Sequence, residues 1–175
     1  MTITIPSTLH LLRHERWPTA AEPPAVPGFI VSSFNPLVAA VAGLCLDGRP
    51  EEPHRRTGLV LASESGDAGT AREVADAVAT GRRVAPLLFF QSNPNAVLGH
   101  VAARHRLDGP IVCLGPLPGG RSIRDRALAE AELLLLDGDA DEVLVVLVEQ
   151  DPDSTAEDTA EALLLRGHLP GKEAP

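Results

Sequence analysis

Aromatic side chains are scarce in this sequence of 175 residues, which has four phenylalanines, one tryptophan and no tyrosine. Cysteine is scarce too. Cys45 and Cys113 stand far apart in apolar surroundings, without the Cys-x-x-Cys spacing of a zinc site. Two such cysteines argue against a disulfide framework and fit a protein of the reducing cytoplasm. We therefore predict no bound metal, and no sequence motif indicates a cofactor.

Positive charge and long apolar runs are also in short supply. There are 15 lysines and arginines against 24 aspartates and glutamates, a formal net charge of -9. An acidic chain without a basic stripe repels a phosphate backbone, so we expect no nucleic-acid partner. The most apolar window, residues 29–46, is broken by serines, an asparagine and a proline and is too short to span a membrane. The first residues do not resemble a secretory signal, so we expect a soluble, cytoplasmic protein.

The length of the chain favours one main domain, which we place at residues 1–150, followed by a C-terminal amphipathic helix and loose tail at 151–175. Continuous apolar runs at 58–62, 110–114 and 142–148 predict strands, and a shorter strand is expected at 2–5. Runs that are apolar on both faces are typical of strands covered by helices on both sides.

Helix signals alternate with these strands. Thr70 and Glu73 predict a capping box, with Val74 and Val78 on one face of the helix, while Asn93 and Ser122 are expected N-caps. Prolines make residues 13–28 irregular. The predicted helices cover residues 36–46, 70–80, 94–105, 122–136 and 155–166. This alternation predicts an α/β fold with a layered, mostly parallel sheet covered by helices.

The run "PNAVLGHVAARHRLDGPIVCLGPLPGG", residues 94–120, resembles the middle of the β-ketoacyl synthases, members of the thiolase superfamily. Residues matching that pattern without a gap are Asn95, Gly99, His100, Leu107, Gly109 and Pro110. "GLVLASESGD" and "GDADEVLVV" are similar to two further segments of the family, so the resemblance covers roughly residues 56–150. It implies a thiolase-like half-fold.

The resemblance fails at the residue that does the chemistry. Counted from Gly109-Pro110, the position of the family's nucleophilic cysteine falls on Pro118. Condensation needs a thiolate to hold the acyl chain, and proline cannot supply one. Cys113 lies five residues early, within the expected strand. The family's catalytic histidines and lysine belong to a C-terminal half that this sequence does not include. We therefore expect no catalytic residue and no condensing activity from the chain alone.

This pattern is similar to shortened ketosynthase-like proteins and to chain-length factors, which lack the cysteine and pair with an active ketosynthase. The resemblance implies a full-length β-ketoacyl synthase as heterodimer partner, in polyketide, aryl-polyene or fatty-acid-like biosynthesis, with acyl carrier protein contacted only through that partner. It also implies that the strand after Gly109-Pro110 pairs across the interface. Residues expected at this interface or at the acyl tunnel are Phe89, Phe90, Gln91, Ser92, Asn95, Gly99, Ile111 and Cys113.

If the two phenylalanines lie in a strand, one faces the core and the other the partner. Gly99 most simply allows another helix to approach.

Two other functions remain open. Residues 63–70, "SESGDAGT", lead from a strand into a helix and could cradle the phosphate of a nucleotide, although the loop lacks both established phosphate-binding motifs. Alternatively, Ser63 or Ser65 could be the nucleophile of an acyltransferase or hydrolase, with His100 or His105 as base.

Overall fold

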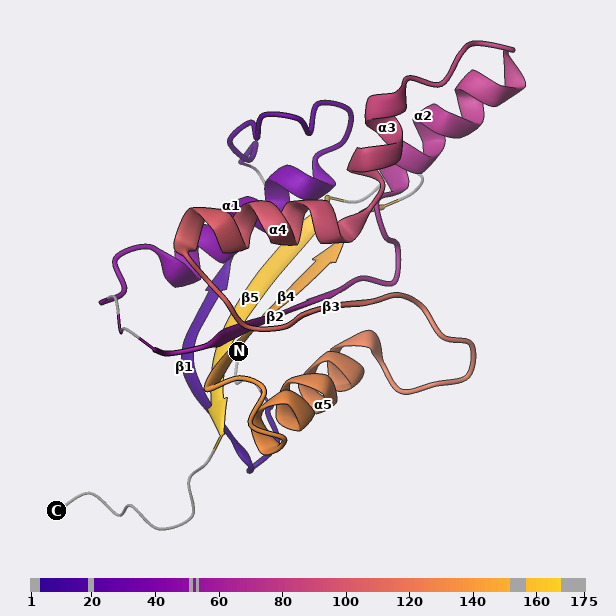
Figure 1. The fold of residues 1–175 in the computed structure, drawn as a ribbon. Helices are drawn as coiled ribbons and strands as arrows, with labels where there is room; N and C mark the ends of the chain where they lie inside the picture. The colour runs from indigo at the N-terminus through magenta and orange to yellow at the C-terminus, as the bar shows by residue number, and fades with distance from the viewer. Residues whose placement is uncertain (1–3, 19–20, 51, 53, 152–156, 168–175) are drawn as a thin grey trace, which may run out of the picture.

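The computed structural model describes residues 4–18, 21–50, 52, 54–151 and 157–167 as one five-stranded sheet with helices on both faces (Figure 1). The strands are β1 (Leu9–Arg16), β2 (Thr57–Ala62), β3 (Ile111–Leu114), β4 (Glu142–Glu149) and β5 (Thr159–Gly167). The helices are α1 (Phe34–Leu46), α2 (Ala68–Ala79), α3 (Pro86–Gln91), α4 (Pro94–His105) and α5 (Ile123–Leu136). The predicted α/β class with a helix-covered sheet is confirmed.

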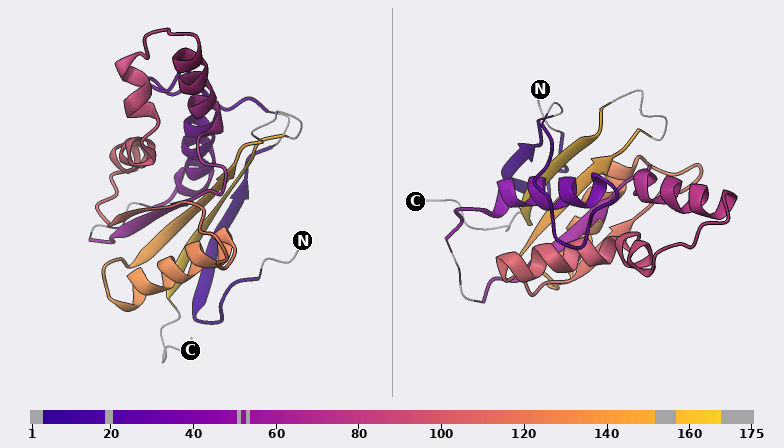
Figure 2. Two further views of the ribbon diagram at one scale, coloured as in Figure 1. Left: turned by 90° about the vertical axis from the view of Figure 1, so that its right-hand side faces the viewer. Right: turned by 90° about the horizontal axis from the view of Figure 1, so that it is seen from above.

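The sheet is mixed, with strand order β1-β5-β4-β2-β3. β4, β2 and β3 run parallel to one another, whereas β5 is antiparallel to both of its neighbours, β4 and β1. Helices α1 and α4 cover one face and α5 covers the other, while α2 and α3 extend beyond the end of the sheet (Figures 1 and 2).

Strand β4 shows why this layering forms. Leu144, Val146 and Val148 point into the core beneath α1 and α4. Val143 and Val145 alternate with them and point into the second core, beneath α5. All five side chains are fully buried, which requires a helix on each face of the sheet.

The prediction of a final helix at 155–166 is wrong where the structure describes it, because Thr159–Gly167 is strand β5. The alanines, glutamates and leucines of this segment are good helix formers, but tertiary contacts override that preference. Residues 162–165 are buried between α1 and α5 and pair with β4 on one side and β1 on the other. The segment thus belongs to the same sheet as the preceding residues; 152–156 and the predicted tail at 168–175 lie outside the described residues.

The N-terminal predictions need two corrections. Thr4 and Ile5 are not in a strand, and residues 2 and 3 lie outside the described part. The first strand begins at Leu9 and takes residues 13–16 out of the segment predicted to be irregular, because pairing with β5 holds them extended.

Helix ends are close to the predicted ones. Asn93 and Ser122 cap α4 and α5 through their side chains, as predicted. The start of α2 was placed too late, since Asp67 accepts the backbone N–H of Thr70 and caps the helix three residues earlier. Thr70 itself is fully buried.

Two glycines offer a matched test of this packing. A Cβ atom on Gly109 would lie 2.4 Å from the carbonyl oxygen of Thr57, whereas one on Gly99 would meet nothing within 4 Å. Gly109→Ala should lower the free energy of unfolding by ~1–3 kcal/mol, because backbone atoms must move apart. Gly99→Ala should raise it by about 0.5–1 kcal/mol, because alanine favours the helix. Urea unfolding of both variants measures the two changes, and a Gly109→Ala variant as stable as the parent would contradict the close approach.

Candidate functional site

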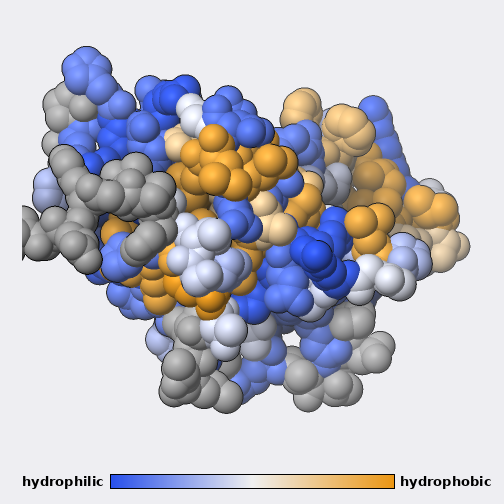
Figure 3. Space-filling view, turned by 90° about the horizontal axis from the view of Figure 1, so that it is seen from below, coloured by the Kyte–Doolittle hydropathy of each residue, from blue (hydrophilic) through white to orange (hydrophobic). Residues whose placement is uncertain are grey.

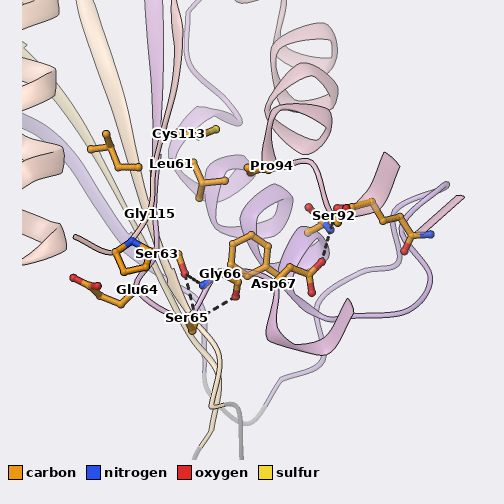
Figure 4. A pocket seen from close by; sticks show the side chains of 15 residues that line it. Leu61, Ser63, Glu64, Ser65, Gly66, Asp67, Ser92, Pro94, Cys113 and Gly115 are labelled. Carbon is orange, nitrogen blue, oxygen red and sulfur yellow. Dashed lines mark hydrogen bonds between the residues drawn. The ribbon is translucent and has the colours of Figure 1, made fainter. Parts of the chain in front are cut away.

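A cavity of about 320 Å³ opens where β2 and β3 end and where α1, α2 and α4 begin. In parallel α/β sheets this carboxyl edge is the usual place for ligands. Figure 4 shows Leu61, Pro94 and Cys113 together on one side, and the loop from Ser63 to Asp67 on the other. The lining is completed by Phe34, Asn35, Gln91, Ser92, Leu114, Gly115 and Pro116.

Some of the predicted interface residues meet at this cavity. Gln91, Ser92 and Cys113 line it, and Asn95 lies next to it because the Cys113 thiol donates to Asn95 Oδ1 over 3.1 Å. Ile111 does not line it, since it begins β3 at the opposite end of the strand. The structure thus splits the predicted set between the cavity and the outer surface.

The aromatic pair and Gly99 belong to the outer surface. Phe89 and Phe90 lie in α3, not in a strand, and their side chains are 78% and 66% exposed. The expectation that one of them faces the core is therefore wrong: in a helix of six residues, only Leu88 and Gln91 turn inward. Gly99 is exposed on α4 with open space around its Cα, so it does not serve a close helix approach within this chain.

Neither cysteine is prepared to act as a nucleophile. Burial raises the pKa of the half-buried Cys113 thiol, which keeps it protonated. Cys45 is fully buried under the sheet, and burial, with a smaller effect from Glu15, raises its pKa to about 11. A reactive cysteine needs the opposite shift.

The loop between β3 and α5 carries no reactive side chain at the position that the family pattern marks. Residues 115–121 are exposed, and Pro118 stands two residues after Pro116 and one before Gly119, whose φ is +70°. Ser122 follows, but its hydroxyl accepts the backbone N–H of Asp125 and caps α5.

Sequence reasoning missed Glu149 and Gln150, which organise the loop after β2. Glu149 Oε1 accepts the backbone N–H of Glu64 at 2.7 Å, and Oε2 accepts that of Ser65 at 2.9 Å. Gln150 accepts the N–H of Gly69 at 3.2 Å and donates to Ser33 at 2.8 Å. The one signal in the sequence that could have indicated them is that two polar residues, Glu149 and Gln150, follow the apolar run of β4 directly.

This arrangement argues against a phosphate cradle. The loop N–H groups of Glu64 and Ser65 that could hold an anion are already bound by the Glu149 carboxylate. The lining adds Glu64 and Asp67 and no lysine, arginine or histidine, so the local charge repels phosphate.

A serine–histidine pair does not form either. Ser63 Oγ lies 3.2 Å from Ser65 Oγ and accepts the N–H of Gly66. Neither candidate base lines the cavity: the His100 ring packs edge-on against Phe29, and His105 lies 3.8 Å from Asp47. Among the described residues, no group of three or more histidines, cysteines or acids is placed to hold a metal ion.

Comparison with known proteins places this fold. No curated protein matches the sequence. A solved ketosynthase in complex with its chain length factor from Xenorhabdus doucetiae has a chain that matches with a TM-score of 0.68 at 18% identity, covering 93% of this chain and 80% of that one. The ishigamide ketosynthase/chain length factor matches with a TM-score of 0.60 at 22% identity, covering 86% of this chain and 51% of its own.

A β-ketoacyl synthase from Burkholderia phymatum STM815 matches with a TM-score of 0.54 at 17% identity, covering 79% of this chain and 42% of its own. The chain thus spans about half or less of the length of the last two structures, and at these identities the likeness is one of thiolase-like fold. The model of the β-ketoacyl synthase N-terminal domain matches residues 31–163. This match includes α1 to α5 and most of the sheet, and it shows that the chain belongs to the β-ketoacyl synthase N-terminal domain family.

Proposed function

We propose that this chain is a non-condensing, ketosynthase-like subunit that pairs with a complete β-ketoacyl synthase and helps to shape its acyl tunnel, as a chain-length factor does. Membership of the ketosynthase family supports a role beside such enzymes. The likeness to structures described as a ketosynthase with its chain length factor supports the pairing. The setting would be polyketide, aryl-polyene or fatty-acid-like biosynthesis in the cytoplasm.

The observation that carries the proposal is the absence of a cysteine in residues 115–122, the segment that leads into α5. Holding an acyl group as a thioester requires a thiolate at the start of this helix, and Pro118 stands at the corresponding position. Cys113 does not replace it, because its thiol is bound to Asn95 and its raised pKa leaves less thiolate at neutral pH. Condensation would therefore be done by the partner.

Exposed apolar residues on α2 and α3 support a protein partner. Val78, Leu87, Phe89 and Phe90 are all exposed, and the two phenylalanine rings contact each other edge to face at 6.0 Å. These two helices extend beyond the sheet (Figure 1). A projecting apolar surface of this kind is typical of a protein–protein contact. We place the rings of Phe89 and Phe90 at the partner's acyl tunnel.

The free edge of β3 supports the same partner. Within the described residues β3 pairs only with β2, which leaves its other side open. An open edge strand invites pairing with another strand. Apolar side chains also reach the surface on the side of the molecule that carries α5, where Leu133 and Leu136 are exposed (Figure 3). We place this second surface outside the contact with the partner.

Acyl carrier protein would be contacted through the partner. Four arginines, Arg49, Arg55, Arg104 and Arg106, line one hollow at the amino end of β2, but Asp47, Glu52 and Asp108 line it as well. Its charges therefore nearly cancel, which gives an acidic carrier protein little attraction to this surface.

The first prediction concerns the aromatic pair. Replacing Phe89 and Phe90 together with alanine should raise the Kd for the partner ketosynthase at least tenfold, because truncating a buried aromatic at an interface costs about 2 kcal/mol or more. The chain lengths made by the complex should also change. Co-purification, calorimetry and mass spectrometry of products measure these effects. Leu136→Ala, at an equally exposed residue of α5, is the control and should change neither; equal behaviour of the two variants would remove Phe89 and Phe90 from the interface.

The second prediction concerns the edge of the sheet. Ile111→Lys should weaken the complex at least tenfold, because a buried unpaired charge costs several kcal/mol. Leu12→Lys is the matched control, since Leu12 lies on the other edge strand and is 38% exposed against 39% for Ile111. Circular dichroism of both variants should match that of the parent chain. A complex that tolerates both lysines would show that β3 does not face the partner.

The third prediction concerns the thiols. Iodoacetamide should label Cys113 more slowly than a free cysteine at pH 8, and faster as the pH rises, because its raised pKa lowers the thiolate fraction. Cys45 should react only after unfolding. Intact-mass spectrometry should find no acyl group on the chain after incubation with acyl carrier protein that carries an acyl thioester, and Cys113→Ser should leave the products of the complex unchanged. An acylated chain would refute the non-condensing role.

A further inference from the structure

A tight turn before α1 presents an exposed isoleucine. Residues 26–29, Val-Pro-Gly-Phe, form this turn, in which the N–H of Phe29 donates to the carbonyl oxygen of Val26 at 3.0 Å. Gly28 has a φ of +91°, which suits the third position of a type II turn after a proline. The side chain that follows the turn, Ile30, is 75% exposed. The backbone of the turn therefore determines where this apolar side chain lies.

Gln91 joins the turn to α3. Its side chain is buried, and its Oε1 accepts the backbone N–H groups of Ile30 at 3.2 Å and Val31 at 3.4 Å. Turning the amide would place Nε2 against these two donors, so the orientation is determined, although Nε2 has no partner among the described residues. Gln91 directly follows Phe90, so Ile30 is held next to the end of α3 that carries the aromatic pair.

The start of α2 is fastened at the same place. Asn35 Nδ2 donates to Asp67 Oδ2, directly before α2, and to the carbonyl oxygen of Gln91 at the end of α3, both at 3.2 Å. Gly69, in the first turn of α2, lies so close to Ser32 that a Cβ atom on the glycine would be 2.7 Å from the serine Oγ. The turn before α1 thus connects with both projecting helices, at the same end of the sheet (Figure 1).

The two stretches of chain that meet here carry no charge. Residues 23–46 and 84–99 contain no aspartate, glutamate, lysine, arginine or histidine, although 22% of the whole chain is charged. The exposed apolar side chains on these stretches include Ile30, Val31, Leu87, Phe89 and Phe90. The core of a protein–protein interface is depleted of charged residues and enriched in aromatic ones. Such a surface fits an apolar protein partner, and it offers no cation to a phosphate backbone or to an acidic carrier protein.

We propose that Ile30 and Val31 extend the surface through which this chain contacts a complete ketosynthase, and that the turn before α1 determines their position. The turn is hydrogen-bonded to α3, so a partner that covers Phe89 and Phe90 also meets Ile30. This inference rests on the proposed pairing role and adds a second segment of contact to it. The partner surface that it fits is apolar and uncharged.

Lysine substitutions at two equally exposed residues test the proposal on the full chain, with the complete ketosynthase encoded nearest to its gene as the partner. Ile30→Lys should raise the Kd at least tenfold, because the charge would be buried without a partner. Leu136→Lys is the control and should bind as the parent does, since Leu136 is 74% exposed against 75% for Ile30 but lies on α5. Calorimetry measures the three Kd values. If Ile30→Lys binds as tightly as the parent, the proposal is wrong and the pairing stands, whereas a parent chain that does not bind would refute the pairing as well.

A pair of glycines separates the shape of the turn from the stability of the chain. Gly28→Val and Gly48→Val each place a β-branched residue at a positive φ, +91° and +73°, where the new Cβ meets no atom within 4 Å. Both should lower the urea midpoint to a similar extent. Only Gly28→Val should raise the Kd for the ketosynthase, at least fivefold, because it displaces Ile30. Equal Kd values for the two variants would overturn the role given to the turn.

The methyl group of Ile30 gives a measurement that needs no variant. Its δ1 ¹³C-methyl NMR signal should shift or broaden when the ketosynthase is added to the parent chain, and an unchanged signal would contradict the contact. A second copy of this chain is the other occupant to test. If Ile30→Lys abolishes self-association of the chain and leaves the Kd for the ketosynthase unchanged, the surface belongs to a homodimer and the proposal is overturned.

Discussion

The burial of β4 on both faces is the constraint on which the rest of this structure depends. Its valines and leucines alternate between two cores, so neither face of the sheet can remain open to water. Helix α1 closes one face and α5 the other. Once these layers are in place, the carboxyl ends of β2, β3 and β4 meet at one edge, and the polar residues that follow each strand are brought together there.

At that edge, where other α/β proteins bind an anion, carboxylate side chains of this chain accept the backbone N–H groups. The Glu149 carboxylate takes the N–H groups of Glu64 and Ser65, and Asp67 takes that of Thr70 at the start of α2. These hydrogen bonds stabilise the loop, and the two carboxylates occupy the backbone N–H groups that an anion would otherwise bind. What remains next to the loop is a largely apolar cavity whose lining residues include two buried groups without a partner among the described residues, Asn35 Oδ1 and Gln91 Nε2. Its chemistry differs from that of a nucleotide or hydrolase site.

On the outer surface, by contrast, several apolar side chains are exposed and are not covered by other parts of the chain that the structure describes. The aromatic pair of α3 and the free edge of β3 both face outward, and neither is explained by the packing of the described residues. Together with the proline predicted to stand where the family carries its thiol, they are the observations behind the proposed pairing with a complete ketosynthase.

Much of this could be predicted from the residues alone. Apolar runs of strand length located β2, β3 and β4, capping residues located α4 and α5, and the order of short motifs from Asn95 to Pro110 indicated the family, which the match over residues 31–163 bears out. These features are local: each depends on neighbours within a few positions, so the sequence displays them directly. The prediction that Pro118 replaces the family's cysteine came from the same motifs.

The tertiary structure decided what depends on distant residues. Residues 159–167 form a strand because two existing strands offer hydrogen bonds and two helices bury their side chains, and no local signal encodes that place in the sheet. Phe89 and Phe90 turn outward together because α3 is a short helix held by only two inward residues. The free oxygen of Asn35 likewise appears only when Asp67 and the Gln91 carbonyl, 32 and 56 positions away, take both of its amide hydrogens. The resemblance of short motifs in order indicated the family and predicted a missing nucleophile, whereas long-range contacts decided which polar groups were satisfied and which were left free.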